Sequence, residues 1–248
     1  MNIENKTVLI TGANRGIGEA LVIEALRRGA KRVYAGTRGA PLTMVDARVT
    51  PVTLDVTNAS QIHRAARDVQ DLDLLINNAG VAIYDDLSNP AVIAQHLAVN
   101  FSGVLSMTNA FLPQLKRSKG AIVNNLSLAA LAPVPIIPAY SISKAAALSM
   151  TQSLRALLAG HGVQVHAVIL GPIDTDMNRG FDIPKASTDT AAKGIFDGLA
   201  NGDEDIFPDP ASRSVADGWR NGATKALERQ FTAFVPTEAS QCHAVSGR

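Results

Sequence analysis

The chain has 248 residues, of which 46% are hydrophobic, 18% charged and only 4% aromatic. This length suits one α/β unit, and an aliphatic core suits parallel strands that are buried on both faces. The 23 lysines and arginines nearly balance the 22 aspartates and glutamates, so no net field favours nucleic acid or an anionic membrane.

Other features exclude further classes. The single cysteine, Cys242, excludes an intramolecular disulfide and a multi-thiolate zinc site, and the five histidines are scattered, so we expect no metal. The polar start of the chain lacks the apolar core of a signal peptide. No segment contains the roughly 18 uninterrupted apolar residues of a membrane span. We therefore expect a cytoplasmic protein with no membrane partner.

Strand and helix patterns alternate along the chain. In order, we expect strand 6–10, helix 16–28, strands 31–36 and 49–54, helix 58–69, strand 72–76, helices 90–100 and onward to 116, strand 121–126, helix 139–159, strand 163–170, helix 187–199, strand 205–207 and helix 211–231. This alternation predicts an α/β Rossmann fold, a doubly wound parallel sheet of about seven strands with helices on both faces. Residues 1–234 are expected to form a single domain and 235–248 a flexible tail.

A glycine-rich turn joins the first strand to the first helix. Its sequence is Thr11-Gly12-Ala13-Asn14-Arg15-Gly16-Ile17-Gly18. Glycines there permit a tight turn and let backbone N–H groups approach a pyrophosphate at the helix N-terminus. The spacing differs from the commoner Gly-x-Gly-x-x-Gly, and an ordinary glycine turn is the alternative. We expect cofactor contacts from Gly12, Asn14, Arg15, Gly16, Ile17 and Gly18.

The end of the second strand bears on the choice of cofactor. An acidic residue there would bind a ribose 2′-hydroxyl and select NAD. The sequence instead has Thr37 and Arg38, with no carboxylate before Asp46. Arg38 and Arg15 are suited to clamp a 2′-phosphate, because planar guanidinium groups make bidentate phosphate contacts. NADP is therefore the expected cofactor, and solvated surface arginines are the alternative.

Polar residues follow the next strands. Asp55 and Val56 come after the third strand and are expected at the adenine edge, although a cap for the following helix explains Asp55 nearly as well. Asn77-Asn78-Ala79-Gly80 follows the fourth strand, at the edge of the sheet where ligands bind in this fold. We expect cofactor contacts from Asn78, Ala79 and Gly80.

Four further residues have polar side chains that are suited to proton transfer. Ser127 ends the fifth strand, Asn100 lies between the two middle helices, and Tyr140 and Lys144 share one face of a long helix because they are four residues apart. A tyrosine pKa is about 10. An ammonium roughly 4 Å away contributes about 4 kcal/mol at an effective dielectric of 20, so we expect Lys144 to lower the pKa of Tyr140 toward neutrality.

In this order, the motifs resemble the short-chain dehydrogenase/reductase family over roughly residues 5 to 200. The resemblance implies a catalytic tetrad of Asn100, Ser127, Tyr140 and Lys144. Asn100 would anchor a water that relays protons to Lys144, and Lys144 would also bind the nicotinamide ribose. The family further implies a homodimer or homotetramer that associates through the middle helices.

Two positions depart from the family pattern. The family usually has Pro-Gly after strand six, whereas this chain has Leu170-Gly171, which is expected to loosen the loop. Gly171, Ile173 and Thr175 are still expected to contact cofactor. Asn125, inside strand five, occupies a position where an apolar residue is expected, and the sequence offers no account of it.

The expected substrate pocket is apolar. It draws on the segments around Ser127 and Tyr140 and on the loop 176–187, through Leu128, Leu131, Pro133, Val134, Ile137, Met177 and Phe181, with Arg179 and Lys185 as the only charged candidates. The sequence thus predicts reversible NADPH-dependent reduction of a hydrophobic ketone or aldehyde. The alternatives are an NAD-preferring alcohol dehydrogenase, an enoyl thioester reductase, whose tyrosine and lysine are typically farther apart, and a non-catalytic NADP-binding regulator.

Overall fold

The computed structural model describes residues 1–42 and 45–235. Its seven strands pair in parallel in the order β3-β2-β1-β4-β5-β6-β7. They are β1 (Thr7–Thr11), β2 (Arg32–Thr37), β3 (Val49–Thr53), β4 (Leu74–Asn77), β5 (Ala121–Asn125), β6 (Gln164–Val168) and β7 (Asp205–Ile206). The strand order reverses between β1 and β4. In open α/β sheets, ligands bind outside the carboxyl ends of the strands at such a reversal.

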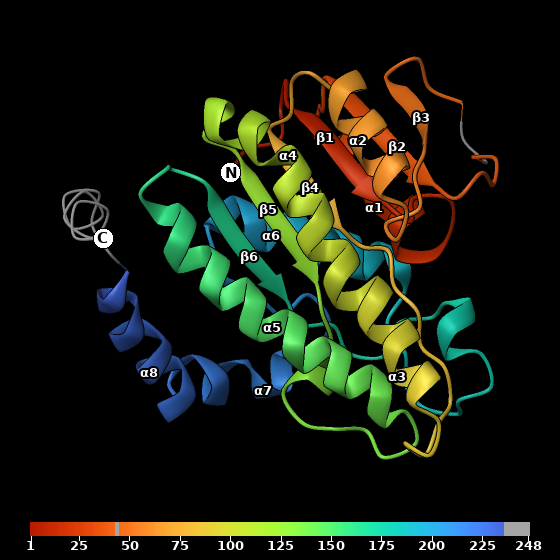
Figure 1. Cartoon of the computed structure of the whole chain (residues 1–248), viewed down its shortest axis with the longest axis vertical. Helices are drawn as coiled ribbons and strands as arrows, with labels where there is room; N and C mark the ends of the chain where they lie inside the picture. Colours follow the sequence, from red (N-terminus) through yellow and green to blue (C-terminus); the bar gives the residue numbers. More distant parts are fainter. Residues whose placement is uncertain (43–44, 236–248) are drawn as a thin grey trace, which may run out of the picture.

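Helices cover both faces of the sheet (Figure 1). In chain order they are α1 (Gly16–Arg27), α2 (Ala59–Asp68), α3 (Pro90–Leu97), the π-helical segment η1 (Ala98–Gly103), α4 (Val104–Ser118), the short η2 (Leu128–Ala130), α5 (Pro138–Ala159), η3 (Asp176–Asn178), α6 (Thr188–Asn201), α7 (Pro210–Arg220), α8 (Ala223–Phe231) and η4 (Thr232–Phe234). In Figure 1, α2, α4 and α5 lie in front of the sheet and α1 and α6 lie behind it. This arrangement confirms the predicted doubly wound Rossmann fold.

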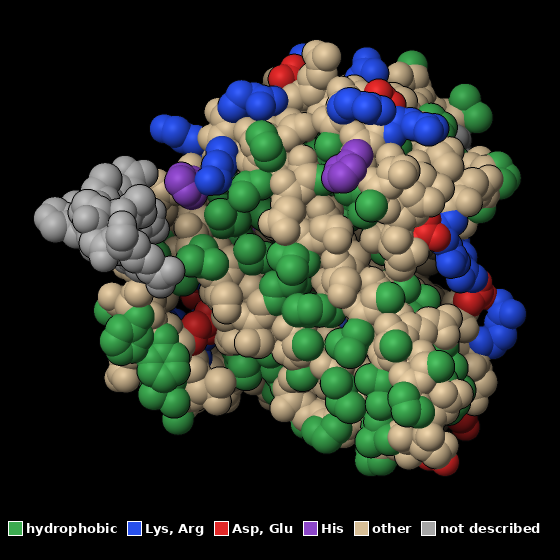
Figure 2. Space-filling view, in the orientation of Figure 1, with side chains coloured by type: hydrophobic (Ala, Val, Ile, Leu, Met, Phe, Trp, Pro, Cys, Tyr) green, Lys and Arg blue, Asp and Glu red, His purple; other side chains and the backbone are tan. Residues whose placement is uncertain are grey.

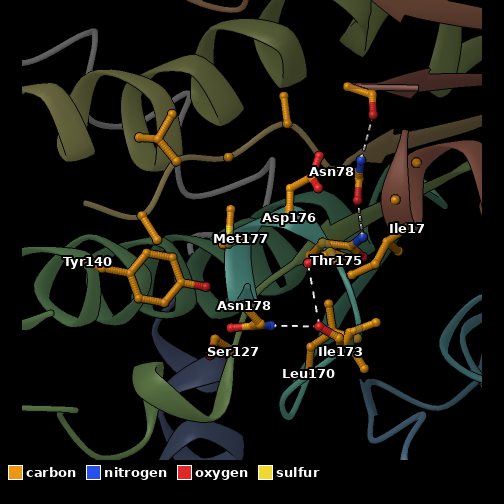
Figure 3. A pocket seen from close by; sticks show the side chains of 18 of the residues that line it. Ile17, Asn78, Ser127, Tyr140, Leu170, Ile173, Thr175, Asp176, Met177 and Asn178 are labelled. Atoms are coloured by element: carbon orange, nitrogen blue, oxygen red, sulfur yellow. Dashed lines mark hydrogen bonds between the residues drawn. The ribbon is translucent and has the colours of Figure 1, made fainter. Parts of the chain in front are cut away.

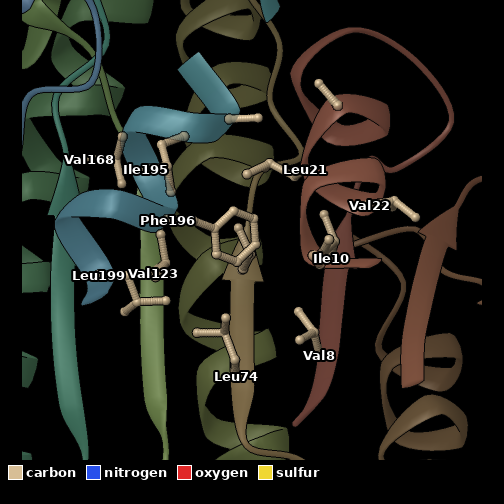
Figure 4. Packing of buried hydrophobic residues seen from close by; sticks show 14 of the residues in the cluster. Val8, Ile10, Leu21, Val22, Leu74, Val123, Val168, Ile195, Phe196 and Leu199 are labelled. Atoms are coloured by element: carbon tan, nitrogen blue, oxygen red, sulfur yellow. The ribbon is translucent and has the colours of Figure 1, made fainter. Parts of the chain in front are cut away.

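Aliphatic side chains fill the space between these layers. Behind the sheet, Leu21 of α1 and Phe196 of α6 pack against Ile10 and Leu74 of the central strands (Figure 4). In front of it, Met107, Phe111 and Leu115 of α4 pack in one cluster with residues of α2 and α5. Both faces of the central strands are therefore buried, as the near absence of charged residues in them predicts.

The middle helices form one continuous run, 90–118, with the π-helical turn η1 at their junction. This helix is long and apolar enough to cross a membrane by length and composition alone, and 33% of its most apolar window is buried. Core helices of soluble proteins pass the same test, so the feature is weak support for a membrane span.

The prediction of a single helix over residues 211–231 is wrong in one respect. The structure has two helices, α7 and α8, separated by Asn221 and Gly222. Gly222 is the N-cap of α8, and a Cβ on it would lie 2.7 Å from the carbonyl oxygen of Gly218. The apolar periodicity continues across the break, which is why the sequence pattern concealed it. Cys242 and all of the expected tail after Val235 lie outside the described residues.

Candidate active site

A cleft of about 470 Å³ follows the carboxyl edge of the sheet. The glycine loop after β1 and the ends of β2 and β4 line one part of it, and Ser127 and Tyr140 line the other. Figure 3 shows Ile17 and Asn78 on one side of the view and the Tyr140 ring on the other, with the segment from Leu170 to Asn178 between them. All the residues expected to bind cofactor line this cleft.

The glycine loop has the geometry of a phosphate-binding turn. Gly12 and Gly16 adopt φ of 66° and 57°, a region that L-residues with side chains rarely adopt. A Cβ on Gly18 would lie 2.0 Å from the carbonyl oxygen of Gly12. The N-cap residue of α1, Arg15, makes no side-chain cap, so the N–H groups of the first turn are left to bind an anion. The loop therefore fits a pyrophosphate.

A second turn is tied to this loop. The hydroxyl oxygen of Thr11 accepts hydrogen bonds of 3.0 Å from the backbone N–H groups of both Asn78 and Ala79. The side-chain amide of Asn78 donates in return to the carbonyl oxygens of Thr11 and Gly12, at 2.9 and 3.2 Å. The ends of β1 and β4 are thus held in a fixed relation at the point where the strand order reverses.

The two arginines expected at a 2′-phosphate have different surroundings. Arg38 is exposed beside Asp55, whose pKa is held below its usual value by hydrogen bonds from Thr57, with a smaller contribution from the charge of Arg38. Asp55 accepts these hydrogen bonds in a turn before α2, whereas the N-cap of that helix is Asn58, so the alternative interpretation of Asp55 as a helix cap is wrong. Arg15 instead pairs with Asp176 of η3 at 2.8 Å, a contact that the sequence did not predict.

Ser127, Tyr140 and Lys144 come together at the other end of the cleft. The ammonium nitrogen of Lys144 lies 5.7 Å from the centre of the Tyr140 ring and donates to the carbonyl oxygen of Asn125 at 2.8 Å. The Ser127 side chain lies close enough to the Tyr140 hydroxyl to favour the ionised form of the phenol. Tyr140 and Lys144 are 9% and 6% exposed. The structure thus brings together three of the four expected catalytic residues around one point.

Burial controls the protonation of this pair. It lowers the pKa of Lys144 from 10.5 to about 8. It also raises the pKa of Tyr140 above 10.0, and the Ser127 side chain only partly opposes that change. The expectation that Lys144 would lower the pKa of Tyr140 is therefore wrong for this structure. The cause is desolvation, which disfavours the charged form of both groups at once.

Asn100 lies behind this point, in the π-helical segment η1, and does not line the cleft. Its amide nitrogen donates to the carbonyl oxygen of Val81 and to the hydroxyl of Ser143, both at 2.9 Å, and its oxygen accepts from the N–H of Val81 at 2.9 Å. A Cβ on Gly80 would lie 3.3 Å from that oxygen and 3.7 Å from the nitrogen of Lys144. Asn100 therefore supports the wall beside Lys144.

The segment after β6 is anchored despite its leucine. Leu170 is 7% exposed, and its carbonyl oxygen accepts a 2.8 Å hydrogen bond from Leu128. The N–H of Gly171 donates at 2.9 Å to Asp209, a fully buried residue that also caps α7. A Cβ on Gly171 would lie 2.5 Å from that carboxylate. The loosening expected from the missing proline is thus countered by an aspartate from a distant helix.

The outer part of the cleft is apolar. Of the residues expected there, Leu128, Val134, Ile137, Met177 and Phe181 line it, whereas Leu131, Pro133, Arg179 and Lys185 do not. Ala82 and Tyr84, in the loop after β4, also line the cleft and were not expected there, and Ile183 lines it from the expected loop 176–187. The rings of Tyr84 and Phe181 stack across the cleft with their centres 5.7 Å apart. The one signal in the sequence is an aromatic residue four positions after Gly80, at Tyr84.

In the part of the chain that the structure describes, histidine and carboxylate side chains do not gather into a metal site. Within residues 1–42 and 45–235, no group of three or more His, Cys, Asp or Glu side chains has metal-binding geometry. His96, which packs edge-on to the Tyr140 ring at 6.3 Å, is fully buried and bonded through both ring nitrogens, to Val92 and Ile83.

Comparison with known proteins agrees with this architecture. Residues 6–185 match the family model for short chain dehydrogenases. A plant relative, 11-beta-hydroxysteroid dehydrogenase-like 3 of Arabidopsis thaliana, is 32% identical over 225 residues, which cover 82% of this chain and 72% of that protein. The chain belongs to the short-chain dehydrogenase/reductase family of oxidoreductases, which confirms the resemblance found in the sequence.

Solved structures support the same assignment. A short chain dehydrogenase from Burkholderia cenocepacia in complex with NADP is 39% identical, covers 95% of this chain and 100% of its own, and superimposes with a TM-score of 0.85. An NADPH-bound carbonyl reductase from chicken fatty liver is 28% identical, covers 80% of this chain and 88% of its own, and has a TM-score of 0.74.

Proposed function

We propose that this protein is an NADP-dependent carbonyl reductase that converts a hydrophobic ketone or aldehyde reversibly to an alcohol. The observation that carries this proposal is the convergence of Ser127, Tyr140 and Lys144 at one end of a cleft whose other end is a phosphate-binding glycine loop. When bound, the dinucleotide supplies the hydride. The protein must bind it, orient the carbonyl and deliver a proton.

Tyr140 is the proposed proton donor. Its raised pKa keeps the phenol protonated at neutral pH, which is the form needed to donate to an oxygen that gains negative charge. Ser127 is placed to hydrogen bond the same oxygen. Lys144, with a pKa near 8, keeps a positive charge beside Tyr140 at neutral pH and stabilises a phenolate after the proton has left. Asn100 holds the wall behind Lys144.

NADP is favoured over NAD by the charges at the glycine end. Arg15 and Arg38 line the cleft there, and no acidic residue ends β2. The NADP and NADPH complexes of the two solved relatives support the same choice. An Arg38→Ala variant should weaken NADPH binding by roughly tenfold, the equivalent of a charge-assisted hydrogen bond, and leave NADH binding unchanged. Equal losses for both dinucleotides would reject this role.

The apolar wall around Leu128, Val134, Met177 and Phe181 favours a hydrophobic substrate. The test is consumption of NADPH and NADH with a panel of hydrophobic ketones, aldehydes and charged keto acids. Tyr140→Phe should lower kcat by about 10²–10⁴-fold, whereas Tyr84→Phe, a matched change at the mouth, should retain turnover. Turnover of the charged keto acids alone would contradict the proposal that the substrate is hydrophobic. Tight NADPH binding without turnover of any carbonyl would favour the non-catalytic regulator.

Association through the middle helices is part of the same proposal. Figure 2 shows hydrophobic side chains over the face formed by α4 and α5, and Ile142 and Leu157 of α5 are 44% and 56% exposed. Exposed apolar faces of this kind favour burial against a second copy. We expect light scattering to give a dimer or tetramer. A mass of one 26.1 kDa chain would reject that state.

A further inference from the structure

Asn125 is an unexpected residue at the end of β5. Its side chain is 6% exposed and lines the cleft, at a position where the strand pattern predicts an apolar residue. Successive residues of a strand point to opposite faces. The neighbouring Asn124 accordingly bonds elsewhere, to Asn77 and to Thr151 of α5. The side chain of Asn125 points to the other face of the strand and does not share these partners.

The hydrogen bonds of Asn78 fix which atom of Asn125 faces it. The amide nitrogen of Asn78 donates to two backbone carbonyl oxygens of the glycine loop, at Thr11 and Gly12, so its own oxygen must point the other way. That oxygen accepts from the amide nitrogen of Asn125 at 2.9 Å. Figure 3 shows Asn78 hydrogen bonded at both ends of its amide. Asn125 therefore donates to Asn78, and Asn78 donates to the glycine loop, so a chain of hydrogen bonds links β5 to that loop.

This arrangement leaves the other amide atom of Asn125 unused. Its side-chain oxygen is buried and has no hydrogen-bond partner among the described residues. A buried acceptor without a partner destabilises the fold, whereas a leucine of similar size has no such atom. Among the described residues, the hydrogen bond of this side chain goes to Asn78. This unpartnered oxygen offsets the hydrogen bond to Asn78, so the side chain contributes little net stability to the fold.

The backbone of the same residue contacts the other half of the site. The carbonyl oxygen of Asn125 accepts from the ammonium of Lys144 at 2.8 Å. One residue thus touches the catalytic lysine through its main chain and the support of the glycine loop through its side chain. A substitution changes the second contact and keeps the first.

We propose that Asn125 is a positioning residue that orients Asn78 and thereby holds the glycine loop in the shape that binds the dinucleotide pyrophosphate. This inference rests on the proposed NADP binding in the cleft. It separates binding from chemistry, because losing the side chain loosens the loop without removing the carbonyl oxygen that holds Lys144.

Asn125→Leu is the first test. We expect the dissociation constant of NADP, measured by titration calorimetry, to rise roughly tenfold, since one neutral hydrogen bond is worth about 1.4 kcal/mol. The KM for NADPH should rise in parallel while kcat at saturation changes less than about threefold. The melting temperature should change little, because the unpartnered oxygen of Asn125 is removed while the oxygen of Asn78 loses its donor.

Asn125→Asp tests the direction of the hydrogen bond. An ionised aspartate cannot donate, so two oxygens would face each other, and turning Asn78 over would only move that repulsion to the carbonyl groups of Thr11 and Gly12. A protonated carboxyl group donates again. The affinity of this variant for NADP should therefore recover as the pH is lowered, beyond any change that the wild type and Asn125→Leu show over the same range.

Thr151→Val is the matched control. It removes a buried hydrogen bond of the neighbouring residue, Asn124, on the other side of the strand. It should lower the melting temperature and leave the NADP dissociation constant unchanged. If Asn125→Leu binds NADP as the wild type does, or if Thr151→Val weakens binding equally, the inference is overturned. A wild-type protein that binds no NADP would overturn the proposed function itself, and this inference with it.

Discussion

Two lysines of this protein are almost completely buried, and their surroundings are opposite. Lys225 of α8 is 2% exposed and forms ion pairs with Glu204, Asp205 and Glu228 at 2.9 to 3.0 Å. Lys144 of α5 is 6% exposed, and its hydrogen-bond acceptor is a neutral backbone carbonyl. The first lysine ties a C-terminal helix to the edge of the sheet, and the second faces the cleft.

The two environments change the pKa in opposite directions. Burial disfavours the charge of Lys225, but hydrogen bonds and charge from Asp205 and Glu204 outweigh it and raise its pKa. Burial is uncompensated at Lys144 and lowers its pKa to about 8. A buried lysine without a carboxylate partner costs stability, and such uncompensated groups occur more often at functional sites than in structural ion pairs. The comparison therefore supports a chemical role for Lys144 and a structural one for Lys225.

The largest effect is expected from Lys144→Met. Loss of the ammonium should lower kcat for carbonyl reduction by about 10²–10⁴-fold, the usual range for a group that supports proton transfer. The melting temperature should be equal to or above that of the wild type, because an unpaired buried charge has been removed. Steady-state kinetics measures the fall in kcat, and thermal unfolding measures the melting temperature. A kcat within threefold of the wild type would contradict the comparison.

Lys225→Met should have the opposite outcome. It leaves three carboxylates with only Arg155, which pairs with Asp205 and Glu228, to balance them. Breaking a buried ion pair from one side costs about 3–5 kcal/mol, and about 3 kcal/mol corresponds to a fall of roughly 6–12 °C in melting temperature for a chain of this size. Activity below the melting temperature should be retained. Unchanged stability would show that the cluster is not structural.

The pH dependence of stability separates the two lysines further. A lysine whose folded pKa is lowered destabilises the fold fully below that pKa, and the cost fades as the pH rises from about 8 to 10.5. Lys144→Met should thus be more stable than the wild type by up to about 3 kcal/mol at neutral pH, with the difference shrinking toward pH 10.5. Denaturant unfolding across this range measures it. A difference that grows with pH would contradict the assignment.

A smaller effect is expected from Trp219→Phe. The indole N–H donates to Asp205 at 2.7 Å, inside the Lys225 cluster, and phenylalanine keeps a ring there without the donor. Loss of a hydrogen bond to a charged group should cost about 1.5–3 kcal/mol of stability, with kcat unchanged. Denaturant unfolding alongside Lys225→Met would show whether the cluster acts as a unit. If Trp219→Phe lost more stability than Lys225→Met, the indole rather than the lysine would be the main stabilising group of the cluster.

The sequence predicted the features that depend on local pattern. Examples are the alternating strands and helices, the glycine turn and the four-residue spacing of Tyr140 and Lys144. Each depends on residues that are close together in the sequence, and the structure contains all of them. The break at Gly222 was missed because the apolar period runs through it. The correct strand and helix predictions and the missed break therefore have the same cause, because both depend on the periodicity of apolar residues.

Contacts between distant segments lay beyond the sequence pattern. Examples are the pairing of Arg15 with Asp176, the anchoring of Gly171 by Asp209, and the ion pairs of Lys225 with Glu204 and Asp205. Only the fold brings these residues together. The pKa of Tyr140 differs from the expected one for a related reason. Helical spacing predicts that the Lys144 charge is near, whereas the burial that dominates the pKa of Tyr140 depends on the surrounding side chains.

The central claim is that the cleft end formed by Ser127, Tyr140 and Lys144 reduces carbonyl compounds with NADPH. The most direct measurement is the initial rate of NADPH consumption with hydrophobic ketones and aldehydes for the wild type, Lys144→Met and Lys225→Met, below the melting temperature of the least stable variant. We predict turnover by the wild type and Lys225→Met, and almost none by Lys144→Met. Equal rates for both variants, or no turnover by the wild type, would contradict the account.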